Sequence, residues 1–280
     1  TIQKDYFLPS LNLKYNLNDK NSLRLGASKT YTLPQAKEIS PYRYVGVNFN
    51  SQGNPNLKPS DHYNLDLKWD FNPTPTELIS LTAFYKLIKN PISRIEVASA
   101  GGYLSYENIA DKATVAGVEV EIRKNLFVRP VSNAAHGMNK LSLGLNGSYI
   151  YTNAKMPLAT VTTGSQLEGA APWIVNFDLS HNFTKGERSF VNTLVLNYVS
   201  DKIYTIGTQG YQDMMEQGVL TLDFVSQAKL NKHLSLNLKA RNLLNPSYKL
   251  SRKANENGEK VILNDYKKGI NISLGVSCTF

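Results

Sequence analysis

The sequence predicts an all-β protein, an antiparallel up-and-down transmembrane β-barrel with about eleven strands in the 280 residues. Three observations support this prediction. Segments of strand length alternate between apolar and polar residues, and the connections between them alternate between short and long. In addition, no apolar run approaches the ~20 residues that a transmembrane helix needs.

The closing segment, residues 266–280, shows the alternation most strictly. From Ile270 onward the even positions are apolar, and the odd positions are small or polar. A period of two gives a strand with one apolar and one polar face. The apolar face would point inward in a soluble barrel and outward to lipid in an outer-membrane barrel. The terminal aromatic, Phe280, is typical of bacterial outer-membrane barrels, and we interpret it as a barrel-assembly signal.

Residues 62–71 favour the outward arrangement. One face of this segment is aromatic and aliphatic, whereas the other carries a histidine, a lysine and two aspartates at positions 62, 68, 66 and 70. Burying such a face in a dry core would cost several kcal/mol for each unpaired charge. A water-filled or plugged lumen removes that cost, so we expect the apolar faces to point outward.

The eleven strands are expected at residues 8–17, 22–31, 62–71, 78–89, 104–126, 141–151, 173–180, 189–202, 218–230, 234–243 and 266–280. Short turns are expected at residues 18–21, 72–77, 184–188 and 231–233, and long irregular loops at 32–61, 90–103, 153–169, 203–217 and 244–265. Short turns at one end of the strands and long loops at the other are typical of a transmembrane β-barrel, with the long loops outside and the C-terminus in the periplasm. The exception is the long connection 127–140, which we interpret as a tolerated insertion among the short turns.

The composition limits the chemistry of the chain. Cys278 is the only cysteine, which excludes an internal disulfide framework. The four histidines are far apart and lack metal-ligand spacing, and no Ser/His/Asp arrangement stands out, so we expect no metal, no cofactor and no enzyme. The formal net charge of +9 comes from scattered Lys and Arg residues. We therefore expect a basic surface that faces water and lipopolysaccharide, and no nucleic-acid partner.

Three internal segments carry a resemblance to a known family. Residues 53–59 read GNPNLKP, residues 116–121 read AGVEVE after YEN at 106–108, and residues 240–245 read ARNLLN before Tyr248. Together with the terminal Phe280, and in this order, they resemble segments of TonB-dependent outer-membrane receptors, especially those of Bacteroidetes.

The resemblance implies a plugged barrel of about 22 strands. Such a barrel imports a scarce nutrient of the siderophore, cofactor or oligosaccharide class, with energy delivered through TonB. About eleven strands make half of that barrel. We therefore expect residues 1–280 to be the C-terminal part of a single outer-membrane barrel domain, without its plug domain and signal peptide. The implied partners are outer-membrane lipid, the plug and barrel half of the same protein, TonB through the plug, and a surface lipoprotein.

Ligand capture is expected in the outward loops, where aromatic side chains can stack on sugar or chelate faces. The candidate residues are Tyr42, Tyr44 and Phe49 in the first long loop, and Tyr204, Tyr211 and Met214 in the fourth. Basic residues on the polar strand faces are expected to pair with acidic residues of a plug, or to attract an anionic substrate. They are Lys14, Arg24, Lys68, Arg123, Lys229, Lys239 and Arg241.

Two other functions stay open at this point. One is a passive outer-membrane channel or structural barrel, which would lack a plug with a TonB-contacting segment. The other is a soluble secreted β-protein that binds carbohydrate, which would bury its apolar faces and need no detergent.

Overall fold

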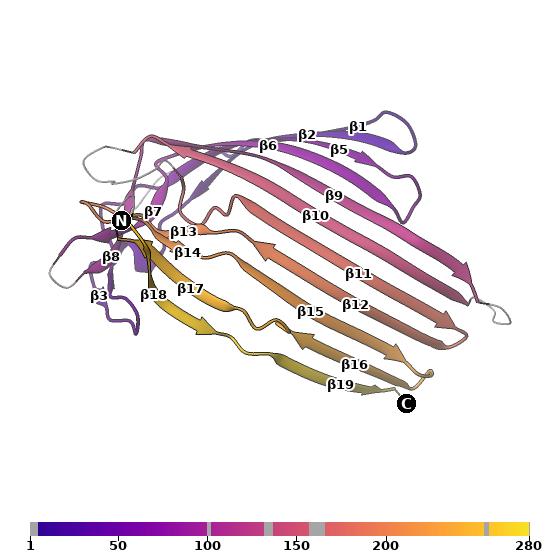
Figure 1. Ribbon diagram of the computed structural model, residues 1–280. Coiled ribbons are helices and arrows are strands. Elements are labelled where there is room, and N and C mark those ends of the chain that lie inside the picture. The colour runs from indigo at the N-terminus through magenta and orange to yellow at the C-terminus, as the bar shows by residue number, and fades with distance from the viewer. Residues whose placement is uncertain (1–4, 100–101, 132–136, 157–165, 255–257, 280) are drawn as a thin grey trace.

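A computed structural model describes residues 5–99, 102–131, 137–156, 166–254 and 258–279. Eleven strands form one curved sheet in which every neighbouring pair is antiparallel (Figure 1). In sheet order they are β1 (Ser10–Asn16), β2 (Asn21–Thr32), β5 (Ser60–Phe71), β6 (Leu78–Lys89), β9 (Lys112–Pro130), β10 (Met138–Ala154), β11 (Trp173–Lys185), β12 (Arg188–Val199), β15 (Val219–Lys229), β16 (Leu234–Arg241) and β19 (Asn271–Cys278). The predicted number and order of the sheet strands are confirmed.

The apolar strand faces are exposed, as expected for a barrel that presents them to lipid. In β5, Tyr63, Leu65 and Leu67 expose 38%, 49% and 51% of their surface. The apolar positions of β19 expose still more, with Leu274 at 70%. This arrangement contradicts the soluble carbohydrate-binding alternative, which required these faces to be buried. Among the described residues, no helix has the length and apolar character needed to cross a bilayer.

On the polar face of the sheet, side chains of neighbouring strands lie next to one another in cross-strand rows. Lys14 of β1 lies opposite Arg24 of β2, which lies opposite Lys68 of β5. Like charges in one cross-strand row repel each other. The buried carboxylate of Asp70 offsets this repulsion, because one of its oxygens lies 3.4 Å from Arg24 Nε and the other lies 3.4 Å from Lys68 Nζ.

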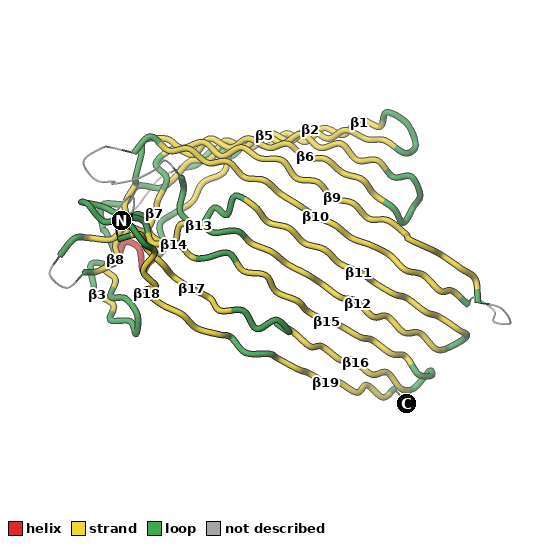
Figure 2. The backbone as a smooth tube through the Cα atoms, in the orientation of Figure 1, coloured by secondary structure: helices red, strands yellow, loops and turns green. Residues whose placement is uncertain are grey.

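The two ends of the sheet differ, as the alternation of short turns and long loops in the sequence predicts (Figure 2). At the short-turn end, tight turns join the strands, and the chain between β11 and β12 has only Gly186 and Glu187. Gly186 adopts φ 61°, a conformation that glycine tolerates without steric cost. The C-terminal end of the described chain lies at this end, where the Thr279 N–H donates to the carbonyl of His233.

The connection predicted at 127–140 is mostly strand. β9 continues to Pro130 and β10 begins at Met138, with a register shift beside Leu141 and Ser142. The expectation of a long insertion among the short turns is therefore wrong for residues 127–130 and 138–140, because the two longest strands of the sheet pair through these positions. Residues 132–136 lie outside the described part of the chain.

The predicted strand 104–126 is two strands. β8 (Tyr103–Asn108) pairs with β7 (Ile92–Val97), whereas β9 pairs with β6. The chain changes direction at the buried residues Ile109 and Ala110, between these two strands. Residues 109–111 contain no glycine or proline that would mark this corner in the sequence, which is why the sequence alone joined the two strands.

The long loops fold into two further sheets instead of staying irregular, and this corrects the expectation from sequence. One sheet has the order β13 (Lys202–Thr205), β14 (Met214–Glu216), β17 (Ser247–Lys253) and β18 (Lys260–Lys267). The other has the order β3 (Arg43–Tyr44), β4 (Ser51–Gln52), β8 and β7, and the short helix α1 (Ala36–Ile39) precedes β3. We call them the rim sheets, and both lie at the long-loop end of the large sheet (Figure 1).

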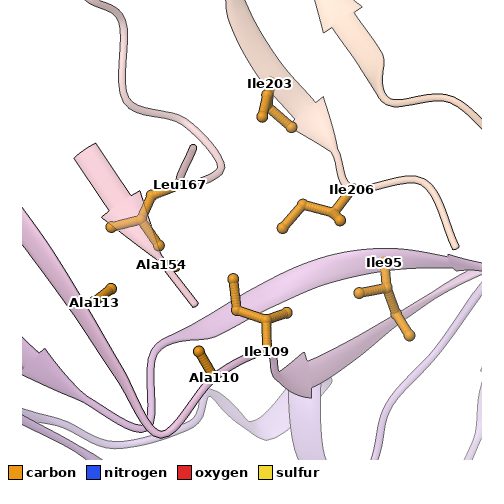
Figure 3. Packing of buried hydrophobic residues seen from close by; sticks show 8 residues of the cluster. All are labelled: Ile95, Ile109, Ala110, Ala113, Ala154, Leu167, Ile203 and Ile206. Atoms are coloured by element: carbon orange, nitrogen blue, oxygen red, sulfur yellow. The ribbon is translucent and has the colours of Figure 1, made fainter. Parts of the chain in front are cut away.

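The main cluster of buried apolar residues sits at this long-loop end and not between the faces of the large sheet (Figure 3). It contains Ile95, Ile109, Ala110, Ala113, Ala154, Leu167, Ile203 and Ile206. Ile95 of β7 forms a parallel bridge with Ile206, which follows β13, so the two rim sheets meet through this cluster. The loops therefore form a packed frame that can hold side chains in fixed positions.

Candidate ligand-binding site

A cavity of about 590 Å³ opens between the two rim sheets. Its lining includes five aromatic side chains and three basic ones: Phe49, Tyr106, Tyr204, Tyr248 and Tyr266, with Lys37, Arg94 and Lys249. The volume is in the range of small-molecule sites. Rings with adjacent cations can hold a ligand that combines flat apolar surface with negative charge.

Arg94 of β7 is the most constrained cation of this cavity. Its Nη2 lies 2.8 Å from Oε1 of Glu168, and its Nε lies 3.2 Å from the same oxygen. The backbone N–H of Arg94 donates to the other carboxylate oxygen of Glu168. The guanidinium carbon also lies 4.1 Å from the centre of the Tyr204 ring, within the range of a cation–π contact. The fork of Arg94 is therefore fixed on two sides.

The electrostatics of Arg94 follow from these contacts. Burial opposes its charge, but the hydrogen bond and the charge of Glu168 outweigh burial and raise the pKa of Arg94 above its ordinary value. Burial also raises the pKa of the neighbouring Tyr106 hydroxyl, and the charge of Arg94 opposes that rise. The cavity therefore holds the permanently charged guanidinium of Arg94 next to the protonated hydroxyl of Tyr106.

Two of the ligand residues expected from sequence come together here. The rings of Phe49 and Tyr204 both line the cavity, with their centres 6.2 Å apart, although they lie in the first and fourth long loops. The cavity is also lined by the stacked pair Tyr248 and Tyr266, with ring centres 5.5 Å apart. The ammonium of Lys268 lies 3.8 Å from the centre of the Tyr248 ring.

The other four expected ligand residues lie elsewhere. Tyr42 is 75% exposed, and Tyr44 has the ammonium of Lys37 5.4 Å from its ring centre. Met214 is only 2% exposed within β14. The ring of Tyr211 lies 5.2 Å from the guanidinium carbon of Arg252.

The seven basic residues expected in the lumen divide into two groups. Three already have carboxylate partners within the large sheet: Arg24 and Lys68 share Asp70, and Arg123 Nη2 lies 2.8 Å from Glu121 Oε1. Four have no ion pair among the described residues: Lys14, Lys229, Lys239 and Arg241. Phe280 lies outside the described residues.

Sequence reasoning missed Arg94, Tyr106 and the Tyr248–Tyr266 pair. Tyr106 and Tyr248 were noted only as parts of sequence motifs, Tyr266 only as the start of the expected closing strand, and Arg94 lies in a short rim strand. No clear alternation marks the rim strands, so the sequence gives no sign that they converge. Among the described residues, no group of three or more His, Cys, Asp or Glu side chains is placed to hold a metal ion.

Comparison with known proteins gives the family. The family model described as "TonB dependent receptor-like, beta-barrel" matches residues 1–243, which is most of the chain. The chain belongs to this family. The resemblance to TonB-dependent receptors is therefore confirmed, and the chain belongs to the outer-membrane β-barrel of this receptor family.

Curated relatives are similar over a limited part of their length. The iron-regulated outer membrane virulence protein of Vibrio cholerae is 25% identical over 228 residues in one strain and 24% identical in another. These alignments cover 78% of this chain and 32% of the relative. The matched part of the chain thus spans about a third of the length of these relatives.

Solved structures of the family share the fold. The ferric enterobactin receptor of Pseudomonas aeruginosa matches with a TM-score of 0.58 at 18% identity, over 98% of this chain and 40% of the receptor. The ferric yersiniabactin uptake receptor of Yersinia pestis matches with a TM-score of 0.61 at 15% identity, over 98% of this chain and 37% of the receptor. At these identities the likeness shows the barrel fold of a TonB-dependent receptor and nothing about the ligand.

Proposed function

We propose that this chain is the C-terminal barrel segment of a TonB-dependent outer-membrane receptor that binds and imports a scarce nutrient. The observation that carries the proposal is the rim cavity, where Arg94 and Tyr204 are held in fixed geometry beside further aromatic rings. We propose an anionic iron chelate of the siderophore class as the nutrient. The names of the iron-regulated and ferric-siderophore relatives support this choice. The proposal assigns no catalytic chemistry to the chain.

We also propose that the sheet is one part of a larger closed barrel. In a meander of eleven antiparallel strands, the first and the last run in the same direction. Joining β1 to β19 would therefore need a parallel pair, and an open edge in lipid leaves backbone groups unpaired at several kcal/mol each. Strands from elsewhere in the same protein would close the barrel and enclose a plug.

The remaining basic side chains of the polar face fit this arrangement. Lys14, Lys229, Lys239 and Arg241 would meet acidic groups of the plug or of the ligand in transit. TonB would act through the plug, and a surface lipoprotein would cover the long loops. With the C-terminus in the periplasm, these loops would face outside, beside the lipopolysaccharide. The segment at residues 53–59 supports a receptor of the Bacteroidetes type.

Uptake of a radioactive iron chelate tests the function. A strain lacking the complete gene would be compared with the same strain carrying it, with ferric enterobactin labelled with radioactive iron as the probe. We expect saturable uptake that depends on the gene and that stops when a protonophore collapses the inner-membrane gradient. Uptake that continues without the gradient would indicate the passive channel instead. If no member of a panel of ferric siderophores depends on the gene, the iron-chelate proposal is wrong.

A further inference from the structure

One ion pair joins the two rim sheets outside the cavity. Arg252 of β17 donates through Nη2 to Oε2 of Glu96, which lies on β7. The two residues are 156 positions apart in the sequence. Neither of them lines the rim cavity.

The Glu96–Arg252 pair is largely buried between the rim sheets. The side chain of Glu96 is 13% exposed and that of Arg252 is 15% exposed, so both charges are largely withdrawn from water. The Tyr211 ring lies over the guanidinium, and the Thr208 hydroxyl donates to the backbone carbonyl of Glu96. Removing one partner of such a pair leaves a nearly buried charge without compensation, which is more costly than loss of an exposed pair.

The same two strands carry opposite walls of the cavity. Arg94 lies two residues before Glu96 on β7, so the two side chains share one side of the strand. Lys249 and Leu250 line the other wall and lie three and two residues, respectively, before Arg252 on β17. The separation of β7 and β17 at the ion pair therefore sets the separation of the walls close by.

The Glu96–Arg252 pair joins a different part of the rim sheets from their other contacts. The other contacts join β7 to β13 and the segment after it. They include the Ile95–Ile206 bridge, in which the N–H of Glu96 donates to the carbonyl of Ile206 over 3.1 Å, the Arg94–Tyr204 contact, and the Thr208 hydroxyl on the Glu96 carbonyl. That bridge joins β7 to the segment after β13, at the opposite edge of its sheet from β18. The direct polar tie between β7 and β17 among the described residues is the Glu96–Arg252 pair.

We propose that Glu96 and Arg252 are positioning residues that set the width of the rim cavity and thereby the size of ligand it admits. The inference rests on the proposed function for its ligand, because the cavity matters only if the rim binds one. The claim that the pair sets the width of the cavity does not depend on the proposed function, since this width can be measured without any ligand. The Glu96 carboxylate and the Arg252 guanidinium do not touch the ligand and act through the strands that carry Arg94 and Lys249.

Spin-label distances across the rim test whether the pair sets the width of the cavity. In the complete gene product, folded in detergent, Cys278 is replaced by serine, and labels are placed at the exposed positions Asn56→Cys and Val261→Cys. Glu96→Gln should lengthen and broaden the distance distribution between the labels. The double exchange Glu96→Arg with Arg252→Glu should restore it, since the two charges meet again in reverse.

A matched control distinguishes loss of the ion pair between the two rim sheets from loss of any ion pair in the rim. Lys202 pairs with Glu216 at 3.4 Å within one rim sheet, so Lys202→Gln should leave the distances unchanged. Heat-modifiable gel mobility shows that each variant has folded, and Arg252→Gln serves as a second variant that breaks the pair if Glu96→Gln fails to fold. Distances that stay the same in a folded Glu96→Gln or Arg252→Gln protein would overturn the proposal.

Binding of ferric enterobactin tests whether this width selects the ligand. We expect its affinity to fall by about tenfold in Glu96→Gln and to recover in the double exchange, a size typical of coupling between two sites. Altered distances with unchanged affinity would overturn the role in ligand selection while leaving the proposed receptor function intact. A wild-type protein that binds no ferric siderophore, but whose rim distances respond as expected, would instead refute the iron-chelate function.

Discussion

The guanidinium carbon of Arg94 lies 4.1 Å from the centre of the Tyr204 ring, so the fixed cation of the rim cavity rests on an aromatic face. The two residues come from different long loops, and β7 and β13 bring them together. A desolvated cation–π contact contributes about 2 kcal/mol, and an exposed one contributes less. The contact therefore links the shape of the cavity to its charge.

Replacing Tyr204 tests this contact. Tyr204→Leu removes the ring and should weaken binding of the iron chelate by about five- to thirty-fold, which corresponds to 1–2 kcal/mol. Tyr204→Phe keeps the ring and should bind within about twofold of the wild type, within the scatter of distal surface changes. Isothermal titration of the complete receptor measures both affinities. Equal losses in the two variants would show that the hydroxyl, and not the ring face, is the group that matters.

The planar shape of the Arg94 guanidinium can be tested separately from its positive charge. Arg94→Lys keeps a cation but loses the planar fork that meets Glu168 and Tyr204, so we expect about tenfold weaker ligand binding. Glu168→Gln leaves the fork in place and removes its counter-charge, so we expect it to loosen Arg94 and weaken binding less. Lysine that binds as well as arginine would contradict the fixed-fork account. Limited proteolysis of the rim would report the loosening in Glu168→Gln.

The sequence predicted the large sheet closely and the rim poorly. Strands such as 62–71 and 78–89 were found because lipid on one side and polar groups on the other impose a period of two, which the residues record directly. The rim strands β7, β13 and β17 are short, and apolar and polar residues do not alternate regularly along them. Phe49 and Tyr204 were chosen because aromatic residues in outer loops often bind ligands. Arg94 was missed because its role depends on Glu168, 74 residues away in the chain.

Gly117 gives a test of packing inside the large sheet. A Cβ atom at this position would come within 2.4 Å of the Phe84 ring and 2.5 Å of the Tyr149 carbonyl oxygen. Gly117→Ala should therefore destabilise the barrel by about 1–3 kcal/mol, the usual cost of overpacking. Gly147→Ala is the matched control, because a Cβ there meets nothing within 4 Å. Urea refolding in detergent measures both, and equal midpoints would contradict the close packing of Phe84 on Gly117.

Glu77 gives a test by pH at the short-turn end. The side-chain hydrogen bond of Lys124, 3.0 Å away, and the backbone N–H of Asn125 hold the pKa of Glu77 below its ordinary value of 4.5. A carboxylate with a lowered folded-state pKa adds stability above the unfolded pKa, and this is lost as the pH falls through the folded pKa. The stability gap between wild type and Glu77→Gln should therefore be full at pH 7 and shrink below about pH 4.5.

Urea midpoints across a pH series measure that gap. Lys124→Met removes the main cause of the lowered pKa, so in this background the loss should begin at higher pH. A gap between wild type and Glu77→Gln that stays constant from pH 7 to pH 3 would show that the carboxylate stabilises the turn by shape alone.

The most direct test of the barrel account compares two adjacent residues of β5. Leu65 lies on the apolar face and Asp66 on the polar face, and both are exposed. In the complete protein in bilayers, with Cys278 replaced by serine, a nitroxide is attached at Leu65→Cys or at Asp66→Cys. The account predicts that membrane-dissolved oxygen relaxes the label at position 65 and that a water-soluble nickel chelate relaxes the label at position 66. The reverse pattern, or nickel access at both positions, would contradict a barrel with its apolar face in lipid.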